Sequence, residues 1–428
     1  MEIKIEIISR ETIKPSSPTP NNLQKHKLSF LDQIAPPIFM PLVYFYPLDN
    51  NVSNSTKSIK LKTSLSQTLT TFYPLAGRLI DDLYVDCNDH GAPYVEAEAN
   101  CEILKVIKNP MCMHKFLPYK LDDIQNLLMA VQITFFQCGG IAVGLVISHK
   151  IADALSLITF ANSWADVARH DNDDTLQPNF EAAAIFPPRD MTGFTSATGL
   201  GNRELVTKIF TFPTSKISVL RERYSGGGDT EFRHPTRVEA LSTFIWTRFK
   251  SATMLKPDPN KIFIVLHAVN LRTRFEPPLS EFYFGNISRI AIAWPAVGDG
   301  GVIDGGYELL QKVREAIQAV NSDYVARLRE EGDNNDHLNF MKELAAQAGN
   351  GKLVAFNFTS LCGFPIYGAD FGWGKPGWVG SGELMYKNLV TFMSTASEDG
   401  IEAWISLTKE DMEIFEGDLE LQQFCIII

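Results

Sequence analysis

Cysteine is scarce in this sequence of 428 residues: there are six, and no two form a Cys-x-x-Cys pair. Structural zinc sites and thioredoxin-like redox sites use such paired spacings. Small secreted domains that depend on disulfides use cysteine far more densely. A chain of this length can bury a full core without either device. The sequence therefore predicts no metal site, no disulfide framework and a reducing, cytoplasmic setting.

Long apolar runs and an excess of positive charge are also missing. The longest apolar stretches, near 140–147 and 262–269, fall well short of the ~20 residues that span a bilayer. The first residues, Met1–Glu6, alternate charged with apolar side chains, which predicts a strand rather than a signal peptide. Lys and Arg number 39 against 50 Asp and Glu, a net charge of -11. This balance disfavours nucleic acid and anionic membranes as partners. We expect a soluble, monomeric protein that binds small molecules.

The last four residues, Cys425–Ile428, formally fit the spacing of a prenylation signal. No basic segment precedes them, and isoleucine is an unusual last residue for such a signal. A packed hydrophobic tail is the favoured interpretation.

The familiar motifs for a covalent nucleophile, a zinc protease or a phosphate-binding loop are absent: there is no G-x-S-x-G, H-E-x-x-H or G-x-x-x-x-G-K-[ST] string. A reaction without metal, redox cofactor or covalent intermediate is the simplest expectation.

Strands alternate with helices along the chain, which predicts an α/β fold in two domains of similar length. We expect an N-terminal domain over 1–170, a polar linker over 171–203 and a C-terminal domain over 204–428. The apolar runs 129–136 and 141–148, separated by Gln137–Gly140, predict a β-hairpin. Other expected elements are a strand over 1–9, helices over 59–72, 154–168, 237–252 and 306–330, and a buried strand over 262–270.

The main candidate for chemistry is His149, which lies between a wholly apolar strand and the following helix. Imidazole titrates near neutrality, so this residue is either a general base or a hydrogen-bonded core histidine. Asp153, four residues later, can orient the ring or anchor the loop by pairing with a buried arginine. A second H-x-x-x-D string, His170 to Asp174, starts the polar linker and is interpreted as solvated surface.

A second segment, Asp370–Pro376, alternates glycine with aromatic residues. Its glycines permit positive φ angles and close backbone approach, and its side chains are poorly suited to proton transfer. A packed structural turn is therefore favoured, and Lys375 can meet a phosphate.

These two motifs, His149–Asp153 (HxxxD) and Asp370–Gly374 (DFGWG), resemble in order and separation those of the plant BAHD acyl-CoA-dependent acyltransferases. Further segments that match over essentially the whole chain are Leu28–Gln33, Phe72–Leu79, Val269–Arg272 and Tyr283–Asn286. The resemblance implies two chloramphenicol-acetyltransferase-like domains, each a mixed β-sheet with flanking helices, and an active-site channel at their interface.

By the same resemblance, acyl-CoA is a co-substrate and no cofactor is permanently bound. His149 is the general base, and Asp153 turns away from the substrate to pair with Arg272. Asp370, Phe371, Gly372, Trp373 and Gly374 are mainly architectural. Lys250, Ser251 and Lys375 are the candidates for contacts with CoA.

The acceptor follows from finer similarities. Two features resemble acylsugar acyltransferases: the proline-rich start, and the segment Thr359–Pro365, which has leucine where many members have tryptophan. Two others, the HxxxD sequence and Asn270–Arg272, resemble alkaloid acetyltransferases. We expect transfer of a short or branched acyl group to a hydroxyl of an acylsucrose, with an alkaloid alcohol as the alternative. A CoA-binding homologue without activity and a hydrolase that activates water with His149 are the rivals of other classes.

Overall fold

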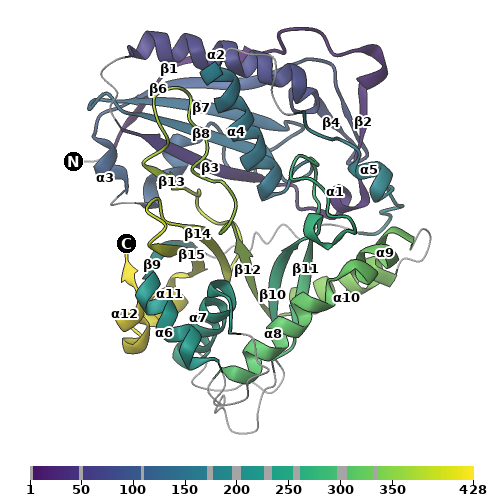
Figure 1. Ribbon diagram of the computed structural model, residues 1–428, viewed down its shortest axis with the longest axis vertical. Coiled ribbons are helices and arrows are strands. Elements are labelled where there is room, and N and C mark those ends of the chain that lie inside the picture. Colours follow the sequence, from purple (N-terminus) through teal and green to yellow (C-terminus); the bar gives the residue numbers. More distant parts are fainter. Residues whose placement is uncertain are drawn as a thin grey trace. The chain divides into compact units, whose positions relative to one another are not determined.

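The computed structural model describes residues 3–47, 52–107, 110–170, 177–194, 204–225, 234–253, 261–295, 306–330 and 336–428. Contacts divide the chain into two compact units, each assembled from three segments. The first unit consists of Met1–Thr198, Pro278–Ile287 and Phe364–Glu383, and the second of Gly199–Pro277, Ser288–Gly363 and Leu384–Ile428. Each unit is a mixed sheet with helices, which confirms the predicted α/β class (Figure 1).

The first unit is built on a six-stranded sheet in which only β6 and β7 run parallel to each other. Every residue of β7 and β8 is buried, including the polar Gln132 and Thr134 of β7. In order across the sheet the strands are β1 (Ile5–Ile13), β6 (Ala92–Ala99), β7 (Met129–Phe136), β8 (Ile141–Ser148), β3 (Phe39–Tyr46) and β13 (Trp378–Gly380). A separate small sheet contains β2 (Lys25–Lys27), β5 (Tyr84–Asp86) and β4 (Arg78–Ile80).

Two long helices, α2 (Asn54–Thr71) and α4 (Ala154–His170), lie side by side over this sheet (Figure 1). The buried indole of Trp164 on α4 donates a hydrogen bond to the Ser64 hydroxyl of α2 at 3.0 Å. Elsewhere η3 (Pro110–Phe116) approaches β8 closely at Gly144, where a Cβ would lie 1.9 Å from the Phe116 carbonyl oxygen. The glycine in mid-strand is therefore a packing requirement. The remaining short helices of this unit are η1 (Asn21–Leu23), α1 (Phe30–Ile34), η2 (Tyr73–Ala76), α3 (Ile103–Ile107) and α5 (Ala182–Ile185).

Segments from the C-terminal half of the sequence complete the first unit. Strand β13 pairs antiparallel with β3, with Trp378 opposite Phe45, and the Tyr46 hydroxyl donates to the Ala369 carbonyl at 2.7 Å. The DFGWG segment thus packs in the first unit, whereas the domain boundaries expected from the sequence put it in the C-terminal domain over 204–428. The expected and observed boundaries differ because long-range strand pairing, and not position along the chain, decides which unit this segment joins.

The second unit contains a seven-stranded sheet with a parallel centre, β10–β12–β14, and antiparallel pairing elsewhere. Buried aromatic residues such as Phe244, Phe249 and Phe415 join its helices to the sheet. The strands, in order across the sheet, are β11 (Ser288–Ala293), β10 (Ile262–Asn270), β12 (Leu353–Ser360), β14 (Leu389–Ser394), β15 (Gly400–Thr408), β9 (Leu205–Pro213) and β16 (Ile426–Ile427). The helices are α6 (Thr214–Arg223), α7 (Arg237–Thr253), η4 (Arg272–Arg274), α8 (Tyr307–Ala319), α9 (Ser322–Glu330), α10 (Asp336–Gly349), α11 (Lys409–Glu416) and α12 (Leu419–Phe424).

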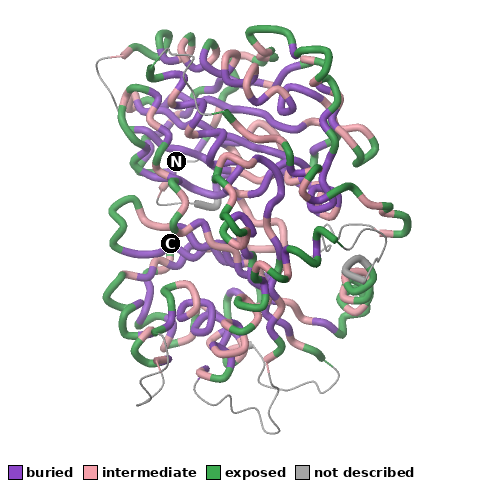
Figure 2. Tube along the Cα trace, turned by 45° about the vertical axis from the view of Figure 1, so that its right-hand side comes forward, coloured by how far each residue is buried: buried purple, intermediate pink, exposed green. Residues whose placement is uncertain are grey.

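Burial follows the strands in both sheets, and exposed residues concentrate on helices and loops (Figure 2). The C-terminal tail is packed: β16 pairs with β9, and the buried Cys425 thiol donates to the Leu421 carbonyl. Within the expected linker, residues 177–194 are described, and Ala182 and Phe186 are buried. Its remaining residues, 171–176 and 195–203, lie outside the described part of the chain, and so does Asp174.

Candidate active site

His149 lies in the turn between β8 and α4, and its backbone and ring are held separately. Its backbone N–H donates to the Ile38 carbonyl at 2.8 Å. Its ring Nδ1 lies 3.0 Å from the Ala152 carbonyl oxygen. A carbonyl oxygen can only accept, so Nδ1 carries the ring proton and Nε2 keeps its lone pair. The ring is thus held as the tautomer in which Nε2 is available to take a proton.

The electrostatic surroundings keep this imidazole neutral. Burial lowers the pKa of His149 below its ordinary value of 6.5, and the Ala152 carbonyl and the Asp153 carboxylate oppose the shift without cancelling it. At neutral pH the ring is therefore unprotonated, which is the state that a general base requires.

Asp153 is buried and uses both carboxylate oxygens within the first unit. Oδ1 accepts the backbone N–H of Ser156 at 2.9 Å, which caps the start of α4, and Oδ2 accepts the N–H of Ile287 at 3.1 Å. Arg272 begins η4 in the second unit, is also buried, and contacts the Asn270 side chain through its backbone N–H and guanidinium. The pairing of Asp153 with Arg272 stays a prediction.

The structure adds two residues to which the sequence analysis gave no role, Asp32 and Asn286. The Asn286 amide nitrogen Nδ2 lies 2.6 Å from the His149 carbonyl oxygen and 2.9 Å from Asp32 Oδ1. Asp32 and Asn286 belong to two of the segments that match in the family resemblance, Leu28–Gln33 and Tyr283–Asn286. A local signal for Asp32 was present, since Ser29-x-x-Asp32 is a capping box.

Lys150, next to the candidate base, is a buried lysine that faces away from solvent. Its Nζ donates to the Gln33 carbonyl at 2.9 Å and lies 3.3 Å from a carboxylate oxygen of the half-exposed Asp82. Burial lowers the pKa of Lys150, and Asp82 opposes that shift. The ammonium group links the HxxxD turn to helix α1 and to the turn between β4 and β5.

The Asp370–Gly374 segment has the geometry of a structural turn. Asp370 Oδ1 accepts the backbone N–H groups of Gly372 and Gly374 at 2.9 and 3.0 Å, and both glycines have positive φ, 99° and 96°. Phe371 is buried with its ring centroid 4.9 Å from that of Trp164. No proton-transfer role is needed to explain these residues.

Of the three residues predicted to contact CoA, Lys250 and Ser251 belong to the second unit and Lys375 to the first. Lys250 lies on α7 with its ammonium 5.4 Å from the centroid of the Trp246 ring, and burial lowers its pKa. Ser251, the next residue of α7, is exposed, and so is Lys375 of the first unit. Their role with CoA stays a prediction.

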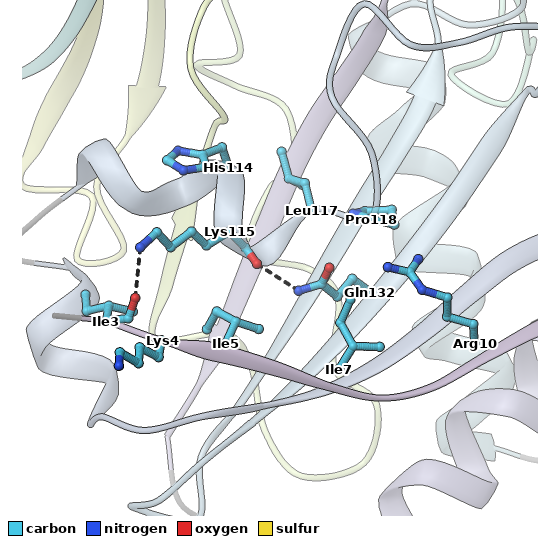
Figure 3. A pocket seen from close by; sticks show the side chains of 10 residues that line it. All are labelled: Ile3, Lys4, Ile5, Ile7, Arg10, His114, Lys115, Leu117, Pro118 and Gln132. Atoms are coloured by element: carbon cyan, nitrogen blue, oxygen red, sulfur yellow. Dashed lines mark hydrogen bonds between the residues drawn. The ribbon is translucent and has the colours of Figure 1, made fainter.

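A cavity of about 490 Å³ in the first unit lies beside β1, η3 and β7 (Figure 3). Lys4, Arg10, His114 and Lys115 contribute to its lining. The Lys115 ammonium is engaged by the Ile3 carbonyl at 2.8 Å, and the Lys115 carbonyl accepts from Gln132 at 2.9 Å. Neither His149 nor Asp153 lines this cavity, so it does not bear on the HxxxD turn.

In the described part of the chain, no helix combines the length and the apolar composition needed to cross a bilayer. Over the same residues, no group of three or more His, Cys, Asp or Glu side chains is arranged to hold a metal ion.

Comparison with known proteins finds a family match over nearly the whole chain and similarity to plant acetyltransferases. Residues 3–422 match the profile of the Transferase family. The chain is 36% identical to stemmadenine O-acetyltransferase of Catharanthus roseus, covering 98% of this chain and 97% of the relative. It is 35% identical to limonoid 1-O-acetyltransferase of Citrus sinensis, covering 99% of each chain.

Solved structures give the same result. The crystal structure of vinorine synthase has a TM-score of 0.85 and 34% identity and covers 99% of this chain and 98% of that one. The structure of F. sporotrichioides TRI101 complexed with coenzyme A and T-2 has a TM-score of 0.71, covering 94% of this chain and 99% of that one. At 17% identity this second likeness supports the fold alone.

Proposed function

The chain belongs to the Transferase family of plant BAHD acyl-CoA-dependent acyltransferases, and we propose that it moves an acyl group from CoA to a hydroxyl of a plant specialised metabolite with His149 as general base. The observation that carries the proposal is the hydrogen bond from His149 Nδ1 to the Ala152 carbonyl. It leaves Nε2 as the basic nitrogen, on a ring whose burial keeps it neutral near pH 7.

The reaction balances with this single imidazole. Nε2 takes the proton of the acceptor hydroxyl while the oxygen attacks the thioester carbonyl carbon of acyl-CoA. The tetrahedral intermediate then collapses with cleavage of the carbon–sulfur bond. The imidazolium returns its proton to the CoA thiolate, so the products are an ester and free CoA. General base catalysis of this kind contributes typically about 10²–10⁴-fold to the rate.

Two acceptor classes have support. The named relatives are acetyltransferases of stemmadenine and of a limonoid, so we propose an alkaloid-type or limonoid-type alcohol as the first acceptor to test. The acylsucrose acceptor rests on the leucine of the Thr359–Pro365 segment together with the proline-rich start of the chain. Leu361 is buried in the second unit, and its backbone N–H donates to the Phe392 carbonyl at 2.8 Å.

The proposal is tested by incubating the purified full chain with acetyl-CoA or a branched short-chain acyl-CoA and, separately, an alkaloid alcohol, a limonoid alcohol and partially acylated sucrose. We expect free thiol to appear only when an acceptor is present, together with an acylated product in the mass spectrum. Thiol release that is equal with and without acceptor identifies a hydrolase. Tight CoA binding without thiol release in any mixture identifies a binding protein, and either result overturns the proposal.

A further inference from the structure

Asp32 is a buried carboxylate with four hydrogen-bond donors around it. Oδ2 accepts from the backbone N–H and the hydroxyl of Ser29 at 2.9 and 2.6 Å. Oδ1 accepts from the backbone N–H and the side-chain amide of Asn286, both at 2.9 Å. Only 1% of its surface is exposed. A carboxylate accepts and never donates when ionised, so Asp32 requires that Asn286 present its amino group.

Asn286 has one amide nitrogen for two acceptors. Its Nδ2 has two hydrogens, and it lies within hydrogen-bond distance of Asp32 Oδ1 and of the His149 carbonyl oxygen. Its Oδ1 is buried and has no hydrogen-bond partner among the described residues. With the amide turned over, that oxygen would face the Asp32 carboxylate and the His149 carbonyl, both of which are acceptors. The orientation with Nδ2 on these two groups is therefore the favourable one.

The backbone holds this amide in place. Gly285, the preceding residue, has a φ of 136°, and a Cβ there would lie 3.1 Å from the Ala182 Cβ. Its N–H donates to the Ser156 hydroxyl at 3.1 Å, and that hydroxyl donates to the Gly285 carbonyl, also at 3.1 Å. The segment before Asn286 is thus tied to the first turn of α4, which follows the HxxxD turn directly.

We propose that Asp32 and Asn286 are positioning residues for His149: the Asp32 carboxylate fixes the Asn286 amide, and this amide holds the carbonyl of the residue that carries the base. With the Ile38 and Ala152 carbonyls, the amide completes three anchors on one residue: on its N–H, its C=O and its ring. The inference rests on the proposed role of His149 and extends it, since both residues act through His149.

Two substitutions separate this role from general stabilisation. Asn286→Ala removes the amide. Asp32→Asn keeps the size of the side chain and can still cap Ser29 with its oxygen, but then presents an amino group to the amino group of Asn286. We expect kcat to fall by roughly 10–100-fold in each, because small misplacements of a catalytic group have effects of that order. KM for acyl-CoA should change little.

The control is Asn162→Ala, which removes an amide whose Nδ2 also donates to a backbone carbonyl, that of Pro365 at 3.0 Å, outside the HxxxD turn. We expect wild-type kcat for it. A purely structural role would lower the amount of folded enzyme without moving the pH dependence. We therefore expect the acid limb of kcat/KM for Asn286→Ala to move to lower pH, because the Asn286 side chain is among the groups that raise the pKa of His149 against its burial.

Folded Asn286→Ala and Asp32→Asn enzymes with wild-type kcat and an unchanged acid limb would overturn the inference. If neither variant folds, hydrogen exchange of the Asn286 side-chain amide in the wild-type protein decides. We expect the side-chain amide of Asn286 to exchange more slowly than that of Asn162, and equal exchange rates would contradict the inference. A wild-type protein that acylates no acceptor would refute the proposed function instead, while amide exchange and NMR titration of His149 would still test the positioning pair.

Discussion

Replacing Asp153 by alanine removes two hydrogen bonds that join the HxxxD turn to its surroundings. One is the cap on α4, from the Ser156 N–H, and the loss of an N-cap costs typically about 1 kcal/mol. The other is accepted from the buried Ile287 N–H, which keeps the Gly285 carbonyl at 3.1 Å as a second acceptor, and a hydrogen bond to a charged group contributes about 1.5–3 kcal/mol. The free energy of unfolding of the first unit should therefore fall by about 2.5–4 kcal/mol in sum.

For a folding unit of this size, each kcal/mol lowers the melting temperature by about 2–4 °C. Asp153→Ala should then melt roughly 5–16 °C below the wild type by this scaling, and its activity should be lost with the geometry of the turn. Differential scanning calorimetry measures the shift, with Asp122→Ala, the loss of an exposed carboxylate, as the control. An Asp153→Ala protein that melts with the wild type and is nevertheless inactive would refute the structural role and assign Asp153 to the chemistry.

Further predictions concern single groups. Burial lowers the pKa of His267 to about 4. Below pH 6.5 this imidazole is therefore protonated in the unfolded state but stays neutral in the folded state. The stability that it contributes above pH 6.5 is lost as pH falls toward 4. Between pH 7 and pH 5, His267 alone should lower the free energy of unfolding by about 2 kcal/mol. In urea unfolding, the decrease in the free energy of unfolding between these two pH values should be smaller by that amount for His267→Phe than for the wild type. Gly285→Ala should lower stability by about 1–3 kcal/mol, because alanine does not tolerate a φ of 136°, and a wild-type urea midpoint would contradict this. Iodoacetamide should leave Cys425 unmodified in the native protein, because burial raises the pKa of its thiol to about 12, whereas the partly exposed Cys138 should react. Equal alkylation of the two cysteines in peptide mass spectrometry would refute the packed tail.

Local patterns in the sequence predict the elements around the site well. The hairpin predicted over 129–136 and 141–148 coincides with β7 and β8, because both runs are predominantly apolar and a glycine pair lies in the turn between them. The helix expected over 306–330 is two helices, α8 and α9. The side chain of Asn321 accepts the Tyr324 N–H at 2.9 Å and so starts the second one, a capping signal that the apolar periodicity alone does not reveal.

Long-range contacts have no comparable local signal. Asp32 and Asn286 are 254 residues apart, and their hydrogen bond depends on the return of Pro278–Ile287 to the first unit. The three residues of β13 are too few to show a strand pattern, yet their pairing with β3 brings the DFGWG segment into the same unit. Family resemblance identified these segments as a set, and the structure supplies the contacts between them.

The central claim is that the Nε2 lone pair of His149 removes the acceptor proton. Its most direct test is the rate of acyl transfer by His149→Ala under single-turnover conditions, with the affinity for CoA measured on the same protein. The account predicts a loss of about 10²–10⁴-fold in the rate, typical of a missing general base, with CoA affinity unchanged. Transfer at the wild-type rate by a folded His149→Ala enzyme would contradict it.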